Sequence, residues 1–123
     1  MLFAELDTDG WELLSAVEEH RIAPETFKIP SEDERMGLVT GQQVKLLFAI
    51  LLPEYAKPTC QVERMWVTIT ARNNYVFQGQ LESLPALTDR LKPGDDVFFT
   101  PDHVAAVMIP QTDPRHPDYQ PGP

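Results

Sequence analysis

A series of apolar segments between residues 44 and 109 constrains the fold of this chain more than any other feature. In the first segment, residues 44–52, Lys45 is the only charged residue, so both faces should be covered, as in a central strand. A buried helix is the alternative, because a short apolar run has no period that separates the two. Pro53 ends the element in either case.

Residues 63–81 predict a β-hairpin, because two stretches of alternating apolar and polar residues flank Arg72, Asn73 and Asn74. Asparagine tolerates the positive φ that tight turns need. Gly79 interrupts the second strand and favours a bulge or a sharp bend, which curls small sheets toward barrels. The face that we expect to lie in the core consists of Met65, Val67, Ile69, Tyr75, Phe77 and Leu81.

The N-terminal part predicts a helix followed by a connector. A loose apolar stripe that includes Trp11 and Leu14 predicts a helix from about Gly10 to Arg21, which Pro24 ends. Residues 23–43 contain two prolines and two glycines and predict an irregular connector. We expect Phe27 and Ile29 to anchor this connector to the core.

The C-terminal part adds a short helix or turn, two strands and a tail. Residues 85–91 predict the helix or turn, Pro93-Gly94 predicts a turn with positive φ at the glycine, and strands begin at Val97 and Val104. Residues 110–123 contain five prolines and predict an extended or disordered tail. The expected fold is therefore one α+β domain over residues 1–109, with a small, strongly bent, barrel-like antiparallel sheet, an N-terminal helix and a Pro-rich C-terminal tail.

Length and cysteine content favour a single cytoplasmic domain. A chain of 123 residues matches the usual size of one domain. Cys60 is the single cysteine, which excludes an internal disulfide and a multi-cysteine metal site and agrees with a reducing compartment. No apolar stretch approaches the ~20 residues that span a bilayer, and the N-terminus does not resemble a signal peptide. We therefore expect a cytoplasmic protein without membrane partners.

The net charge of −9 is concentrated at the N-terminus. Residues 1–36 hold ten acidic and three basic side chains, whereas residues 37–123 hold nine acidic and seven basic ones. This charge repels phosphate backbones, so nucleic acid is excluded as an expected partner. An acidic surface can steer a basic protein toward it, or it can be a solvated face that keeps the chain soluble.

Four short patterns carry a resemblance to a known family. In order and spacing they resemble a group of small bacterial domains of unknown function, some of which look like immunity proteins of polymorphic-toxin loci. The resemblance covers about residues 26–107 and assigns no catalytic residues, but it implies that a toxin is the partner. The patterns are Gly41-x-x-Val44-Lys45-Leu46-Leu47-Phe48, Glu63-Arg64-Met65-Trp66-Val67, Phe77-x-Gly79-x-Leu81, and Leu91-Lys92-x-Gly94-Asp95-x-Val97-x-Phe99 followed by His103-Val104.

The alternation of the hairpin directs Trp66 and Arg64 away from the core face. A large aromatic residue beside an arginine is typical of protein-binding hot spots. The alternative is that the N-terminal helix or the connector covers this face and makes Trp66 a second core residue. The predicted partner-binding residues are Trp66, Arg64 and Gln78 on the sheet, and Glu12, Glu18 and Glu19 on the helix.

Catalytic and metal-binding patterns are sparse. His20, His103 and His116 are scattered without metal-ligand spacing. A Cys60/His103 dyad is a weaker interpretation than a plain buried cysteine. We therefore expect no metal, no cofactor and no enzymatic activity.

Two functions from different classes remain. The first is a non-catalytic protein-binding module, in its most specific form an immunity-type protein that neutralises a basic toxin domain. The alternative is a small-ligand-binding domain or minor enzyme. Its pocket between helix and sheet would bring together polar groups such as Arg64, Tyr75 and His103.

Overall fold

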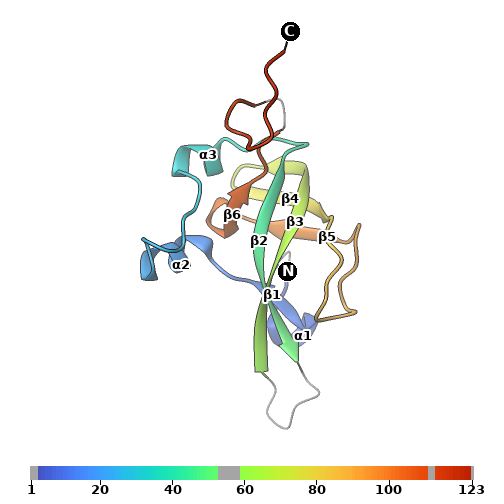
Figure 1. The fold of residues 1–123 in the computed structure, drawn as a ribbon. Helices are drawn as coiled ribbons and strands as arrows, with labels where there is room; N and C mark the ends of the chain where they lie inside the picture. The colour runs from blue at the N-terminus through green and yellow to red at the C-terminus, as the bar shows by residue number, and fades with distance from the viewer. Residues whose placement is uncertain (1–2, 53–58, 111–112, 123) are drawn as a thin grey trace.

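The computed structural model describes residues 3–52, 59–110 and 113–122, and these form one antiparallel sheet with short helices around it (Figure 1). The strands follow the order β1-β2-β3-β4-β5, and β6 pairs with β2. Their bounds are β1 Trp11–Leu13, β2 Gln43–Leu52, β3 Thr59–Asn73, β4 Val76–Leu81, β5 Asp96–Phe99 and β6 Val104–Val107.

The sheet curls strongly, and two short strands share one edge of β2. The β1 residue Trp11 pairs with Ile50 near one end of β2, and the β6 residue Ala106 pairs with Lys45 near the other. A 3-10 turn, η1 (Pro101–His103), leads directly from the last strand of the path, β5, back to β6. Figure 1 shows β4 and β5 lying across the long β2–β3 pair. The result is a half-barrel, and the expected bent antiparallel sheet is confirmed.

Gly79 occupies a position with no room for a side chain. A Cβ atom there would lie 2.4 Å from Val67 Cγ1 and 2.7 Å from the Thr68 carbonyl oxygen. The register of β3 against β4 shifts between Ile69 and Ala71, and Ile69 pairs with Gly79. The predicted bend is therefore present, but the extra residue lies in β3, opposite the glycine.

The inner face of the sheet forms the main core. The predicted core face of the hairpin is confirmed for five of its six residues. The prediction is wrong for Tyr75, which is 61% exposed. Asn73 pairs with Val76, which leaves Asn74 and Tyr75 as a two-residue turn with φ 55° at Asn74. The buried members of this core are Trp11, Leu38, Val44, Leu46, Phe48, Ile50, Leu52, Met65, Val67, Ile69, Phe77, Leu81, Leu91, Val97, Phe99 and Val104.

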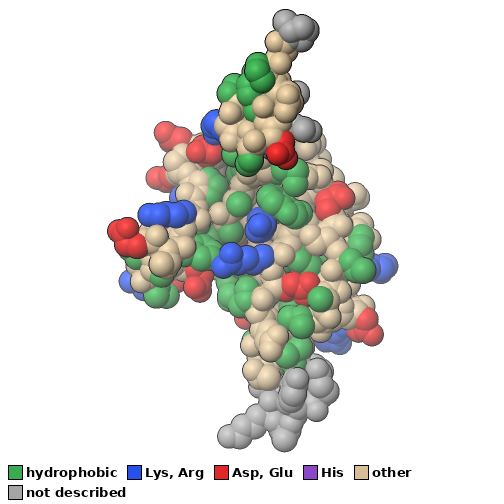
Figure 2. All heavy atoms as spheres, viewed as in Figure 1, with side chains coloured by type: hydrophobic (Ala, Val, Ile, Leu, Met, Phe, Trp, Pro, Cys, Tyr) green, Lys and Arg blue, Asp and Glu red, His purple; other side chains and the backbone are tan. Residues whose placement is uncertain are grey.

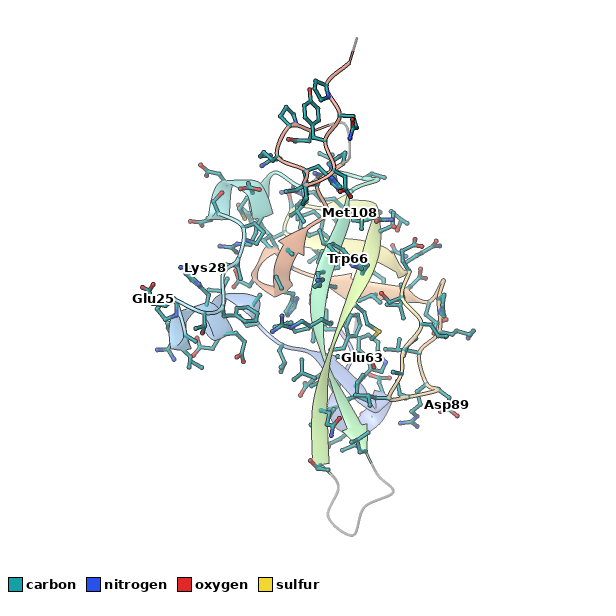
Figure 3. All side chains as sticks on the ribbon, in the orientation of Figure 1. Glu25, Lys28, Glu63, Trp66, Asp89 and Met108 are labelled. Atoms are coloured by element: carbon teal, nitrogen blue, oxygen red, sulfur yellow. The ribbon has the colours of Figure 1, made fainter. Side chains whose placement is uncertain are left out.

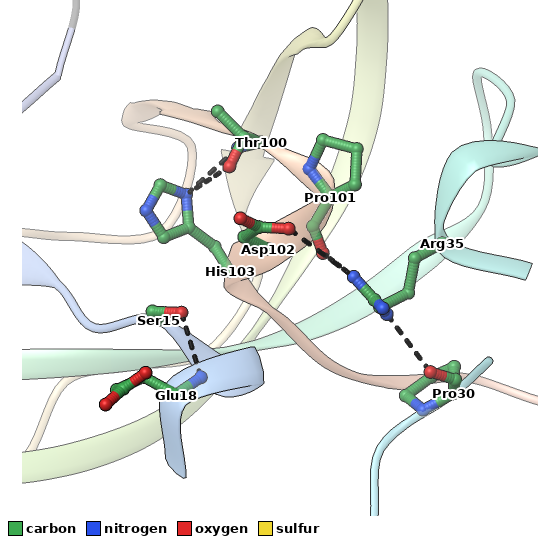
Figure 4. Close-up of polar contacts among 8 residues, drawn as sticks. All are labelled: Ser15, Glu18, Pro30, Arg35, Thr100, Pro101, Asp102 and His103. Carbon is green, nitrogen blue, oxygen red and sulfur yellow. Dashed lines mark hydrogen bonds and ion pairs between the residues drawn. The ribbon is translucent and has the colours of Figure 1, made fainter. Parts of the chain in front are cut away.

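The single helix expected over residues 10–21 is wrong. The segment begins with α1 (Leu6–Asp9), continues as β1 and ends as α2 (Ala16–Ile22). Gly10 ends α1 in the left-handed region at φ 81°, and the Ser15 Oγ accepts the Glu18 N–H at the start of α2 (Figure 4). The extended conformation places Trp11 against Phe48 in the core, with ring centroids 5.5 Å apart.

The outer face of the sheet carries a smaller apolar cluster. Ala16 of α2 packs there with Leu47 of β2 and Ala105 of β6, and Phe27 and Ile29 pack against them. The prediction that Phe27 and Ile29 anchor the connector is therefore confirmed. The anchored segment covers only part of the outer face.

Arg35 fastens the rest of the connector to η1. It belongs to α3 (Glu32–Met36) and is 8% exposed. Its Nε donates to the Pro30 carbonyl oxygen at 3.1 Å and its Nη1 to the Pro101 carbonyl oxygen at 3.2 Å, while Asp102 lies 3.6 Å away (Figure 4). Because all of these partners are acceptors, the buried guanidinium is compensated where it lies.

The remaining segments lack regular structure. Residues 85–91 contain bends but no helix, and the Pro93-Gly94 turn has the expected positive φ, 92° at Gly94. Residues 113–122 of the tail form turns, and Cys60 is exposed on β3 instead of buried. Among the described residues, the longest helix is α2 with seven residues, and no helix has the length and apolar character that crossing a membrane requires.

Candidate protein-binding surface

Trp66 lies on the outer face of β3, directly opposite Lys45 of β2 in the strand register. Figure 3 shows Trp66 over the middle of the β2–β3 pair, below Met108. Side chains two residues apart share a strand face, so Arg64 and Thr68 flank the indole. We define the Trp66 face as the surface formed by Lys45, Arg64, Trp66, Thr68 and Met108.

The backbone of Trp66 is held from the β4 side. Its N–H donates to the Ser83 Oγ at 2.9 Å, and its carbonyl oxygen accepts the Glu82 N–H at 2.9 Å. Both contacts lie just beyond the end of β4, where the strand ladder has stopped. They fix the position from which the indole projects.

Two cations pack against aromatic rings on this face. The Lys45 Nζ lies 4.8 Å from the Trp66 ring centroid, and the Arg64 Cζ lies 5.3 Å from the Phe27 centroid. Such contacts contribute about 0.5–1 kcal/mol at exposed sites. They hold the charges against apolar surface while leaving their remaining N–H donors available.

Trp66 belongs to neither apolar cluster. The alternative from the sequence is that a helix or the connector buries Trp66 in a second core. The residue that α2 and the connector bury on this face is instead Leu47 of β2, which is 2% exposed. Trp66 itself is half-buried. A large aromatic side chain that is half-buried and belongs to neither core is typical of a contact surface.

Hydrogen-bonded side chains and a methionine border the Trp66 face. Gln43 Nε2 donates to Thr68 Oγ1 at 3.3 Å, and Thr68 Oγ1 donates to Glu82 Oε1 at 2.8 Å. Met108 is 42% exposed, and its N–H donates to the Gln43 carbonyl oxygen at 2.8 Å. Flexible methionine side chains adapt readily to apolar partners. The border thus combines ordered polar groups with an adaptable apolar one.

The charge of the Trp66 face is opposite to that of the whole chain. Within the described ranges, the four ion pairs involve other cations, and Lys45 and Arg64 are in none of them. Figure 2 shows Lys and Arg side chains near the centre of this side of the molecule, over β2 and β3, with most Asp and Glu side chains toward its margin. A chain with 19 acidic residues thus presents a local cationic spot.

The other predicted partner-binding residues lie elsewhere. Gln78 pairs with Phe98 of β5, farther along β4 toward the hairpin turn. Glu12 pairs with Ala49, Glu18 of α2 forms an ion pair with Arg21, and Glu19 is half-buried on the same helix. The Arg21 guanidinium lowers the pKa of the Glu18 carboxyl. The six residues therefore do not form one patch.

Sequence reasoning missed Lys45 and Met108 of the Trp66 face, and also Ser83, which holds the backbone of Trp66. Lys45 is the single charge in the apolar run of residues 44–52, and Ser83 follows the second strand of the hairpin. The alternation of β2 was a usable signal for Lys45, since a lone charge in a central strand must reach solvent on the outer face. The role of Ser83 depends on β4 ending two residues earlier, for which the sequence carries no comparable signal.

His103 occupies a separate pocket of about 400 Å³ with Phe3, Glu12, Phe98 and Asp102 in its wall. Its Nδ1 accepts the Thr100 N–H at 2.9 Å (Figure 4), and burial lowers the pKa of the imidazole. Neither Arg64 nor Tyr75 lines this pocket. The convergence of polar groups expected for the ligand-binding alternative is not formed by these three residues.

Comparisons with known proteins return no match, whether with protein-family models, with curated proteins or with solved structures.

Proposed function

We propose that this chain is a non-catalytic protein-binding module that contacts its partner with the Trp66 face. The observation that carries the proposal is the placement of Trp66: its backbone is held by Ser83 and Glu82, and its side chain lies outside both apolar clusters. A pre-positioned aromatic residue loses little conformational entropy on binding. Tryptophan and arginine are also the residue types most enriched among binding hot spots.

In its most specific form, the module is a cytoplasmic immunity-type protein that binds and neutralises a cognate toxin domain. The family resemblance and the uneven charge support this form. The N-terminal acidic residues favour long-range attraction of a basic toxin, an effect that acts mainly on the association rate.

Binding to the product of the adjacent open reading frame tests the proposal. Purified wild-type chain is titrated with that protein by calorimetry, and Trp66→Ala is compared with Tyr75→Ala. Tyr75 is a matched control, because it is an aromatic residue 61% exposed in the hairpin turn, away from the Trp66 face. We expect Trp66→Ala to weaken binding by about 2–4 kcal/mol, the usual loss at a hot spot, and Tyr75→Ala to leave affinity unchanged.

Equal affinities of the two variants contradict the proposed surface. The immunity form has a further test in cells that express the toxin. Wild-type chain should restore growth and Trp66→Ala should not, provided that both accumulate to the same level.

A further inference from the structure

We infer that the segment of the partner that contacts the Trp66 face carries carboxylates beside an apolar side chain. This inference rests on the proposed function and specifies the chemistry of its partner. It differs from the expectation based on net charge, in which the partner surface is basic.

The argument starts from the surroundings of Lys45 and Arg64. Both side chains lie on the outer face of adjacent strands, where Lys45 is opposite Trp66 and Leu47 is opposite Arg64. Each packs its charged end against an aromatic ring and forms no ion pair within the described part of the chain. Their N–H donors therefore remain available to an incoming acceptor.

The carboxylates closest in the strand register are engaged elsewhere. Glu63 accepts the N–H groups of Ala86 and Leu87, at 2.7 Å and 3.2 Å, on the loop that follows β4. Glu82 accepts from Thr68 Oγ1. Figure 3 shows Glu63 below Trp66, toward the loop that carries Asp89. The two acids thus stabilise the sheet and its loop instead of pairing with the cations.

An acidic segment is the occupant that these groups fit. Asp or Glu side chains would accept from the Lys45 ammonium and the Arg64 guanidinium, which can bind a carboxylate in bidentate geometry. An apolar neighbour would cover the free part of the indole and contact Met108, which is 42% exposed. A basic segment would meet two like charges and lose affinity. The N-terminal acidic residues still attract a basic protein at long range, whereas the Trp66 face determines the chemistry of the segment in direct contact.

Selection of random linear peptides displayed on phage tests this inference without a known partner. The library is selected on the full chain, and the enriched peptides are synthesised. Their affinities are measured for wild type, for Trp66→Ala and for the double reversal Lys45→Glu with Arg64→Glu. Arg21→Glu with Arg90→Glu is the matched control, because both cations are exposed, lie on α2 and on the loop that follows β4, and give the same change of net charge.

We expect the enriched peptides to contain Asp or Glu next to an apolar residue. Their affinity should fall about tenfold or more in the Lys45/Arg64 reversal, less in the Arg21/Arg90 control, and also as salt is added. Circular dichroism and thermal unfolding of each variant verify that the fold is retained.

The remaining outcomes separate the inference from the proposed function. Peptides that need Trp66 but are rich in Lys or Arg, or ignore the Lys45/Arg64 reversal, overturn the inference and leave the function standing. Enrichment that ignores Trp66→Ala, or no enrichment, overturns both. Self-association of the chain in sedimentation experiments, abolished by the Lys45/Arg64 reversal, would assign the face to a second copy and overturn the inference.

Discussion

The two faces of the β2–β3 pair differ in how their residues are buried. On the inner face, Val44, Phe48 and Val67 have no exposed surface, because the curled sheet packs against itself. On the outer face, Leu47 is buried only where α2 and the connector reach it, whereas Trp66 lies beyond them. Burial on the inner face follows from strand pairing, while burial on the outer face depends on separate segments. The uncovered part of the outer face is thus available for a partner.

The largest expected loss of stability is on the inner face. Phe77 is fully buried and stacks on Phe99 with ring centroids 5.2 Å apart. We expect Phe77→Ala to lower the free energy of unfolding by about 3–5 kcal/mol, because it removes apolar contacts and leaves a cavity. Urea unfolding followed by circular dichroism measures this value. A loss below about 1 kcal/mol would contradict the assignment of Phe77 to the core.

A smaller loss is expected at the covered part of the outer face. Leu47→Ala should cost about 2–3 kcal/mol, at the lower end for a buried leucine, because α2 and the connector can move into the space. Leu84→Ala is the control: Leu84 is 78% exposed, and its truncation should change stability by no more than about 0.5 kcal/mol. Equal losses for the two variants would mean that α2 does not cover Leu47.

The attachment of the connector to η1 can be broken separately through Arg35. Arg35→Met keeps the aliphatic stem and removes the donors to Pro30 and Pro101. We expect a loss of about 1–3 kcal/mol, because the two carbonyl groups lose their partner. Hydrogen exchange should rise in residues 23–40 more than in β3. Uniform exchange across the molecule would show instead that the connector and the sheet unfold together.

A pH effect is expected at His103. Burial lowers the pKa of His103 in the folded state. Below about pH 6.5 the unfolded chain therefore binds more protons than the folded chain, and the free energy of unfolding decreases as the pH is lowered. Above that pH His103 is neutral in both states and causes no loss of stability. His103→Asn should reduce this dependence, since its Oδ1 can still accept the Thr100 N–H but does not titrate. Unfolding of both proteins at pH 7.5 and 5.5 checks this, and identical slopes would assign the effect to other groups.

Apart from the Leu84→Ala control, the smallest effect on stability is expected at Trp66. Trp66→Ala removes a half-buried ring that belongs to neither apolar cluster and one cation–π contact, so the free energy of unfolding should fall by about 1 kcal/mol. Thermal unfolding measures this change. A loss as large as that of Phe77→Ala would show that Trp66 is a core residue and would contradict the difference described between the two faces.

Prediction from sequence succeeded where local pattern and packing agree. Alternation located the hairpin and five of its six core residues, and Pro93-Gly94 located a turn. It failed for Tyr75, because the register of the two strands moves the turn by one residue. It also failed at residues 10–21, where pairing with the free edge of β2 favours an extended Trp11 over a helical one.

The candidate site was predicted in part. Alternation placed Trp66 and Arg64 outside the core face, and both are on the Trp66 face. Gln78 and the three glutamates were grouped with them on composition and alternation, but strand order separates them. Lys45 was absent from the prediction, because its position beside Trp66 depends on the register between two strands.

The sequence by itself determined the hairpin of residues 63–81, five of the six residues expected on its inner face and the acidic N-terminus, because these follow from residue type and period two. Only the tertiary structure decided which part of the outer face is covered. That outcome depends on where Phe27, Ile29 and Arg35 dock the connector, and long-range docking has no local periodic signal. The same long-range register places two cations beside Trp66 in a chain whose net charge is −9.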